Sequence, residues 1–142
     1  MALRTGKANM SDTIELDKIL VIEDNRDSRD ILSKLLRMSG YDVMSASDGE
    51  TGYTAALKHE PDLIITDIHM PKMDGIEFVK RIRLEGSLAE TPVLVVTAFG
   101  SNVAREAIEA GANASAEKPF DFDKFLGTVQ GLIGRGKKAV HT

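Results

Sequence analysis

The stretch Asp62-Leu63-Ile64-Ile65-Thr66-Asp67-Ile68-His69-Met70-Pro71 decides the fold. The run from Leu63 to Ile65 predicts a fully buried strand, because it is apolar and contains β-branched residues. Pro61 precedes the run, and turn-forming residues between Pro71 and Gly75 follow it. This places Asp67 at the carboxyl end of the strand, the edge where open parallel α/β sheets bind their ligands. A turn or cap carboxylate is the alternative interpretation of Asp67 taken alone.

Composition limits the class of protein. The 142 residues are enough for one domain with a core, and contents of 42 % apolar and 28 % charged residues are typical of a soluble globular protein. A formal net charge of −4 argues against nucleic-acid binding through the whole surface. The absence of cysteine excludes disulfides and thiolate metal sites. No apolar run approaches the roughly 20 residues of a membrane span, and no signal core follows Met1 to Lys7, so we expect a cytoplasmic protein without membrane binding.

Apolar segments alternate between strand-like runs and helical periodicity. We expect strands at 18–22, 42–46, 63–67, 93–97 and 114–116. We expect helices that begin near Asp27, Ser47 or Asp48, Gly75, Ser101 and Asp121, and that end near Gly40, His59, Leu84, Gly111 and Ile133. This alternation with short connections predicts one α/β domain, a doubly wound five-stranded parallel sheet with five helices. The domain should span 18–133, between a flexible leader at 1–17 and a flexible tail at 134–142.

Helical spacing and capping preferences predict several local details. The inward-facing side chains should include Ile31, Leu32, Leu35 and Leu36 in one helix, and Val103, Ala107 and Ile108 in the helix that Ser101 caps. Gly52 lies inside another predicted helix. It is either simply tolerated there, or it allows the helix to approach the sheet closely.

Polar residues lie at or just beyond the carboxyl ends of the predicted strands, at one edge of the sheet: Glu23, Asp24, Asp67, Thr97 and Lys118. Three neighbouring carboxylates repel one another, and a hard divalent cation removes this conflict. An all-oxygen site with places left for water suits Mg²⁺ or Mn²⁺. A carboxylate there can attack a phosphoryl donor, while the hydroxyl and the ammonium bind the phosphoryl oxygens. Each residue alone could be a turn, strand-end or surface residue, but their joint placement favours a site.

Five motifs in this order resemble the response-regulator receiver domain. They are Glu23-Asp24-Asn25, Asp67 with Met70-Pro71 and Met73-Asp74-Gly75, Val96-Thr97-Ala98, Gly111-Ala112, and Lys118-Pro119-Phe120. The resemblance covers about Lys18 to Ile133 and implies a flavodoxin-like, CheY-like sheet with the strand order 2-1-3-4-5. It implies a stand-alone single-domain regulator, although the receiver fragment of a larger regulator or hybrid kinase would have the same sequence.

The resemblance also implies a role in a phosphorelay. Asp67 would accept a phosphoryl group from a histidine kinase or a histidine phosphotransfer protein in a Mg²⁺-dependent reaction. Asp24, Asp67 and the backbone carbonyl of His69 would bind the metal directly, and Glu23 would bind it through water. The chain would catalyse only its own phosphorylation and dephosphorylation, and so would not be an enzyme in the ordinary sense.

The remaining implied roles concern the phosphoryl group and the output. Thr97 would move toward the phosphoryl group, Lys118 would pair with it, and the Lys118–Pro119 bond would be cis. Phosphorylation would switch protein–protein binding through the helix after Ser101, the strand at 114–116 and the last helix. No nucleic acid and no membrane would take part.

Two positions depart from the family pattern. The first acidic position is often Asp and here is Glu23, which keeps the charge. Ser115, three residues before the lysine, replaces the usual Tyr or Phe that swings inward when the threonine moves. Phe99, two residues after Thr97, is therefore a candidate switch residue. A partly buried loop aromatic is the alternative.

Other interpretations stay open. His69 could control water access to an acyl phosphate or be an exposed loop histidine, and His59 and His141 should lie at the surface. An aspartate-nucleophile phosphohydrolase would need a second Asp at position 69. A flavin or nucleotide module would need a Gly/Ser/Thr-rich cradle after the first strand, where this chain has Glu23, Asp24 and nearby Asp27. A degenerate receiver that acts only as a scaffold would not be labelled by acetyl phosphate.

Overall fold

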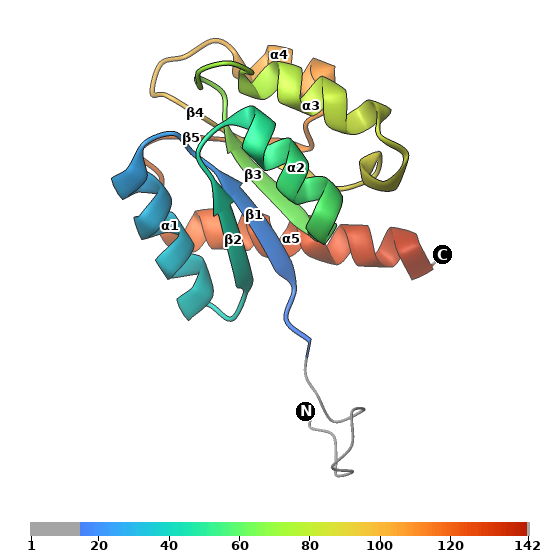
Figure 1. The fold of residues 1–142 in the computed structure, drawn as a ribbon. Helices are drawn as coiled ribbons and strands as arrows, with labels where there is room; N and C mark the ends of the chain where they lie inside the picture. The colour runs from blue at the N-terminus through green and yellow to red at the C-terminus, as the bar shows by residue number, and fades with distance from the viewer. Residues whose placement is uncertain (1–14, 142) are drawn as a thin grey trace, which may run out of the picture.

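The computed structural model describes residues 15–141, in which strands and helices alternate along the chain (Figure 1). The strands are β1 (Lys18–Ile22), β2 (Asp42–Ala46), β3 (Leu63–Asp67), β4 (Val93–Thr97) and β5 (Ala114–Glu117). The helices are α1 (Arg26–Met38), α2 (Gly49–His59), α3 (Gly75–Leu84), α4 (Ala104–Ala110) and α5 (Phe122–His141), with a 3₁₀ turn, η2 (Gly86–Leu88). All strand pairs are parallel, in the order β2-β1-β3-β4-β5. The predicted fold class and strand order are therefore confirmed, while residues 1–14 of the predicted leader lie outside the described residues.

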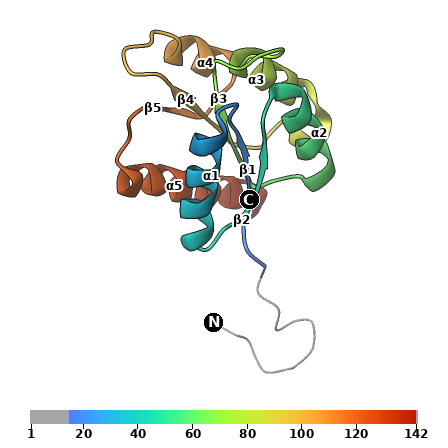
Figure 2. The same cartoon turned by 60° about the vertical axis from the view of Figure 1, so that its left-hand side comes forward.

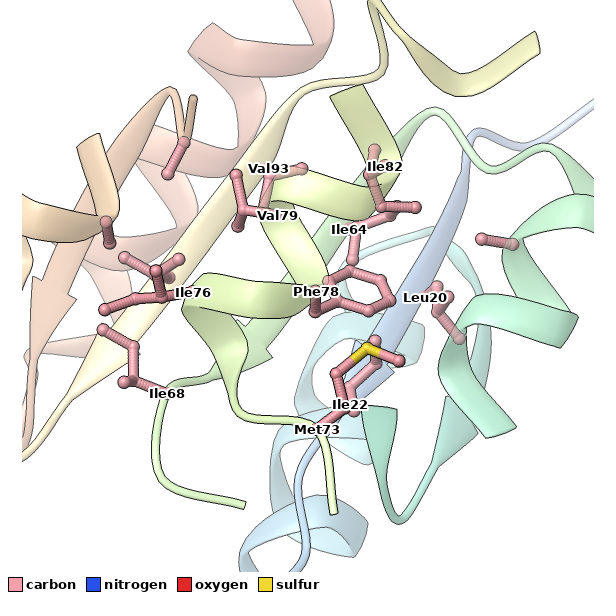
Figure 3. Close-up of a cluster of buried hydrophobic side chains, with 14 of the residues drawn as sticks. Leu20, Ile22, Ile64, Ile68, Met73, Ile76, Phe78, Val79, Ile82 and Val93 are labelled. Atoms are coloured by element: carbon pink, nitrogen blue, oxygen red, sulfur yellow. The ribbon is translucent and has the colours of Figure 1, made fainter. Parts of the chain in front are cut away.

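The sheet is buried on both faces, because successive residues of each strand point to opposite sides. Leu20 and Ile22 of β1 join a core cluster with residues of α2, α3 and α4, in which Phe78 of α3 lies against side chains of the sheet (Figure 3). Ile19 and Val21 join a second cluster with residues of α1 and α5. Figure 2 shows the helices on the two sides of the sheet. This arrangement leaves the ends of the strands as the place for polar side chains.

Side-chain caps fix the beginnings of three helices. The side chain of Asn25 accepts a hydrogen bond from the backbone N–H of Ser28 in α1. Asp48 and Asp74 cap α2 and α3 in the same way, each accepting from a backbone N–H of the helix that it precedes. Each cap satisfies a backbone N–H group that the first helical turn leaves free. Asp48, one of the two predicted alternatives, is therefore the cap of α2.

Helix α4 differs from the prediction, because Ser101 is not its N-cap. The helix begins at Ala104, and its N-cap residue Val103 makes no side-chain cap hydrogen bond within the described part of the chain. The Ser101 hydroxyl instead accepts a hydrogen bond from the Val103 N–H at 3.3 Å. Ile108 is 43 % exposed and was wrongly predicted to face inward, whereas Ala107 is buried.

Two further predictions need correction. Ile31 is 61 % exposed, so it does not share the buried face of Leu36. Helix α5 continues past Ile133 to His141 instead of ending there. In residues 15–141 no helix combines the length and apolar character that a membrane span requires.

Gly52 allows α2 to pack closely against the sheet, which was one of the two interpretations of this residue. A Cβ atom at Gly52 would overlap the Ile22 side chain. Residue 52 is buried within α2, so simple tolerance of glycine does not explain it.

We expect Ser33→Ala to stabilise the protein by about 1 kcal/mol. Ser33 is 3 % exposed in α1, and its hydroxyl oxygen has no hydrogen-bond partner in the part of the chain that the structure describes. Alanine removes this unpaired polar atom and favours the helix. Urea unfolding measures the change. Ser39→Ala, which removes an exposed hydroxyl bonded to the Leu35 carbonyl, serves as the control. A less stable Ser33→Ala protein would contradict the prediction.

Candidate functional site

Three carboxylates lie together at the carboxyl edge of the sheet. Glu23 and Asp24 directly follow β1, and Asp67 is the last residue of β3. One oxygen from each side chain lies within 4.8 Å of the others. Glu23 is buried, Asp67 is half-buried and Asp24 is exposed, so the cluster opens to solvent on the Asp24 side.

Lys118 completes this cluster from the loop after β5. Its Nζ atom lies 2.9 Å from Glu23 Oε1 and 3.5 Å from Asp67 Oδ2. The Lys118–Pro119 peptide bond is cis, which confirms that prediction. The Lys118 N–H donates to the Thr97 carbonyl at 2.8 Å and thus joins this loop to the end of β4.

The surrounding groups raise the pKa of Lys118. Burial alone would lower the pKa, but the hydrogen bond to Glu23 and the negative charges of Asp67 and Glu23 outweigh burial. Lys118 is therefore an ammonium ion at neutral pH. One ammonium balances only part of the charge of three carboxylates, so the site retains an excess of negative charge.

The backbone around Asp67 fixes the orientation of its carboxylate. Asp67 Oδ1 accepts a hydrogen bond from the Ile68 N–H at 2.8 Å, while Oδ2 faces Lys118. The Gly75 N–H donates to the Ile68 carbonyl at 2.8 Å. A Cβ atom at Gly75 would lie 2.5 Å from the Asp67 carbonyl oxygen, so only glycine allows α3 to begin this close to Asp67.

Glu23 is held at both carboxylate oxygens. Oε2 accepts a hydrogen bond from the Asn25 N–H at 3.0 Å, and Oε1 pairs with Lys118. The Arg29 guanidinium donates to the Glu23 carbonyl at 2.9 Å. This role of Arg29 has no signal in the sequence, because helical spacing does not distinguish Arg29 from the neighbouring Arg26.

The structure places the other candidate residues around this cluster. Thr97, 2 % exposed, ends β4 beside the end of β3, since its neighbour Val96 pairs with Asp67. His69 lies exposed in the loop after β3, and His59 is exposed at the end of α2. The side chain of His141 lies outside the described residues.

The two switch candidates both lie at the surface. Ser115 is exposed on β5, opposite Val95 of β4. Phe99 is 80 % exposed in the loop between β4 and α4, so the alternative of a partly buried loop aromatic is wrong.

An apolar groove with a volume of about 630 Å³ opens beside the site. Glu23, Asp67 and Lys118 form its polar end. Its remaining lining is mainly apolar and includes Ile31, Leu32, Leu35, Phe99, Phe120 and Phe122. This groove has no signal in the sequence, because it depends on how α1 and the loop after β5 are spaced.

The donor set fits a hard divalent cation. Within residues 15–141, Glu23, Asp24 and Asp67 form the only group of three or more potential His, Cys, Asp or Glu ligands that lie this close together. All their donor atoms are carboxylate oxygens, which Mg²⁺ and Mn²⁺ prefer, and the exposed Asp24 side leaves room for water ligands. The acidic residues can therefore hold such an ion, and Lys118 can bind an anionic group beside it.

Comparisons with known proteins give one consistent result. The family model described as "Response regulator receiver domain" matches residues 19–130. Among curated proteins, the DNA-binding dual master transcriptional regulator RpaA of Synechocystis is 37 % identical over 121 residues, covering 84 % of this chain and 50 % of RpaA. The polar-differentiation response regulator DivK of Brucella anthropi is 31 % identical over 117 residues, covering 82 % of this chain and 95 % of DivK.

Solved structures agree with the sequence matches. The chemotaxis response regulator CheY4 of Vibrio cholerae superposes with a TM-score of 0.77 at 34 % identity, covering 83 % of this chain and 99 % of CheY4. A putative response regulator from Chloroflexus aurantiacus gives a TM-score of 0.81 at 31 % identity, covering 84 % of this chain and 99 % of that one. The chain spans about half the length of RpaA and nearly all of DivK.

Proposed function

Because this chain belongs to the family of response regulator receiver domains, which act in two-component signalling, we propose that Asp67 is its phosphoacceptor. The donor would be a histidine kinase or a histidine phosphotransfer protein. The observation that carries this proposal is the Asp67 carboxylate, which has one oxygen fixed by the Ile68 N–H and the other beside Lys118. Such an arrangement presents one oxygen for attack and a cation for the incoming phosphoryl group.

The reaction is a phosphoryl transfer between the donor and the carboxylate. Asp67 Oδ2 forms a bond to phosphorus, and the P–N bond of the phosphohistidine breaks. The bonding electron pair leaves with the imidazole, which takes a proton from solvent. Lys118 stabilises the negative charge on the phosphoryl oxygens, and the Thr97 hydroxyl donates a hydrogen bond to one of them.

We further propose that Asp24, Asp67 and the backbone carbonyl of His69 hold Mg²⁺ or Mn²⁺ directly, and that Glu23 acts through water. The ion would neutralise charge on the phosphoryl oxygens. Glu23 then has a second role, because its ion pair orients Lys118 toward Asp67.

The output proposed for this domain is a change in protein–protein binding through the face of α4, β5 and α5. The functional unit is 18–133, either as a stand-alone regulator or as the receiver part of a larger regulator or hybrid kinase. RpaA is named as a DNA-binding regulator, and about half of RpaA lies outside its match to this chain. We assign no nucleic-acid contact to the receiver unit, since the net charge of the chain is −4.

Incubation with acetyl phosphate and Mg²⁺, followed by intact-mass measurement and site mapping, tests the proposed chemistry. We expect a mass gain of one phosphoryl group, located on Asp67 and released by hydroxylamine, because an acyl phosphate is labile to that nucleophile. Stable labelling of a serine, threonine or histidine, or no labelling at all, would contradict the proposal.

We expect Mg²⁺ to stabilise the fold against unfolding, and Asp24→Asn to abolish this effect. An ion that binds only the folded state adds about 2.7 kcal/mol at roughly 100 times its dissociation constant. Thermal unfolding with and without Mg²⁺ measures the change. Asp27→Asn removes an exposed carboxylate of the first turn of α1 and should leave the Mg²⁺ effect intact. An undiminished effect in Asp24→Asn would exclude Asp24 as a ligand.

A further inference from the structure

Phe99 is a large aromatic side chain in an unusual position. It is 80 % exposed, in a loop that begins directly after Thr97, the last residue of β4. The next residue, Gly100, has a φ of +79°, a backbone conformation that glycine adopts without strain. The ring therefore lies in water, next to a glycine in the left-handed region of the backbone.

The apolar groove lies within reach of this ring, because Phe99 itself forms part of its lining. Ile31, Leu32 and Leu35 of α1 form one wall, and Phe120 and Phe122 contribute from the loop before α5 and from the first residue of α5. Ile31 is 61 % exposed, so the wall presents apolar surface to water. The same groove ends at Asp67 and Lys118, which connects it directly to the proposed phosphoacceptor.

The loop carrying Phe99 is held at Gly100, whose N–H donates to Glu117 Oε2 on β5 at 2.9 Å. Helix α4 begins without a side-chain cap among the described residues. At the other end of α4, the Arg83 guanidinium donates to the Gly111 carbonyl at 2.9 Å and to Asn113 Oδ1 at 2.7 Å. A displacement that begins at Thr97 would therefore have to break the exposed Gly100–Glu117 hydrogen bond, while the end of α4 stays held by Arg83.

On these grounds we propose that Phe99 is the switch aromatic of this chain and that its ring enters the groove when Asp67 is phosphorylated. This inference rests on the proposed function. The hydrogen bond proposed above from the Thr97 hydroxyl to the phosphoryl group would pull on the chain two residues before Phe99 and so draw the loop toward the site. Entry of the ring removes apolar surface of both Phe99 and the α1 wall from water, which favours the closed state. Ser115 cannot act in this way, because it is an exposed serine without an apolar ring.

A single fluorescent reporter can follow this movement, because the chain contains no tryptophan. Phe99→Trp replaces one exposed aromatic with another and places the sole indole at the proposed switch. On treatment with acetyl phosphate and Mg²⁺, we expect the emission maximum to move to shorter wavelength and quenching by acrylamide to fall. Intact mass measured on the same sample gives the fraction phosphorylated.

Control variants separate entry into the groove from a general change. Leu84→Trp places the indole at an 87 % exposed position at the end of α3, outside the groove, and should show no shift. In the Phe99→Trp background, Ile31→Gln makes the groove wall polar and should reduce the shift without reducing the label. Met38→Gln, the same change at a 73 % exposed residue of α1 outside the groove, should leave the shift intact.

The possible outcomes are distinguishable. Full labelling of Asp67 with an unchanged emission spectrum overturns the role of Phe99 and leaves the proposed phosphoacceptor in place. A shift that persists undiminished in Ile31→Gln overturns the groove as the destination of the ring. Absence of label overturns the proposed function, and with it this inference.

Discussion

Replacing Gly75 with alanine is expected to destabilise the fold by about 3 kcal/mol and to slow phosphoryl transfer to Asp67. The added Cβ atom would lie 2.5 Å from the Asp67 carbonyl oxygen and 2.7 Å from the Ile68 Cα atom. Both are backbone atoms, which cannot turn aside as a side chain can. Either α3 or the end of β3 must therefore shift, and a shift of β3 moves the Asp67 carboxylate away from Lys118.

Gly127→Ala is the matched control for this prediction. Gly127 also lies in a helix, α5, but is exposed, and a Cβ atom there would meet nothing within 4 Å among the described residues. Alanine should stabilise this position by about 0.5 to 1 kcal/mol, because it favours the helix. Urea unfolding and the acetyl phosphate labelling rate measure both variants. Equal stabilities for the two variants would show that the close approach at Gly75 has no energetic importance.

The strands could be predicted from the sequence because each is a short apolar run with clear limits. Leu63 to Ile65 between Pro61 and Asp67 is the clearest case, and the structure has β3 at Leu63–Asp67. The alternation of strands and helices along the chain then limits the sheet to a few topologies, since crossover connections between parallel strands are right-handed. The strand order itself came from the family resemblance and not from the strands.

The wrong predictions concern positions where local pattern and tertiary structure disagree. Ser101 has the chemistry of an N-cap, but α4 begins three residues later, at Ala104. Ile31 and Ile108 have apolar side chains, yet each lies beyond the edge of the face that its helix buries. Periodicity predicts that a helix has a buried face, but not how wide that face is.

The candidate site was predictable as a set of residues but not as a geometry. Glu23, Asp24, Asp67 and Lys118 were expected to meet because each lies at or just beyond the carboxyl end of a predicted strand, and the structure brings them together. The hydrogen bond of Arg29 and the apolar groove depend on the packing of α1 against the sheet, which no short motif specifies. The roles of these residues in phosphoryl transfer remain predictions for the labelling experiments.

Asp67→Asn is expected to reduce labelling by acetyl phosphate to background while the protein remains folded. An amide is a very poor nucleophile toward phosphorus, and an uncharged side chain no longer attracts the divalent ion. The fold should tolerate the change, because the Asn carbonyl oxygen can still accept the hydrogen bond from the Ile68 N–H. Circular dichroism checks the fold, and intact mass measures the label over time.

Asp27→Asn is the control for this amide substitution. It removes a carboxylate near the start of α1, outside the cluster of Glu23, Asp24 and Asp67, and should be labelled like the unchanged protein. If Asp67→Asn took up hydroxylamine-sensitive phosphate as fast as Asp27→Asn, another carboxylate would be the acceptor. Asp24 is exposed and lies in the same cluster, so the double variant Asp24→Asn/Asp67→Asn would then decide between them. The expected order, full label in Asp27→Asn and none in either Asp67 variant, follows only if one oriented carboxylate performs the chemistry.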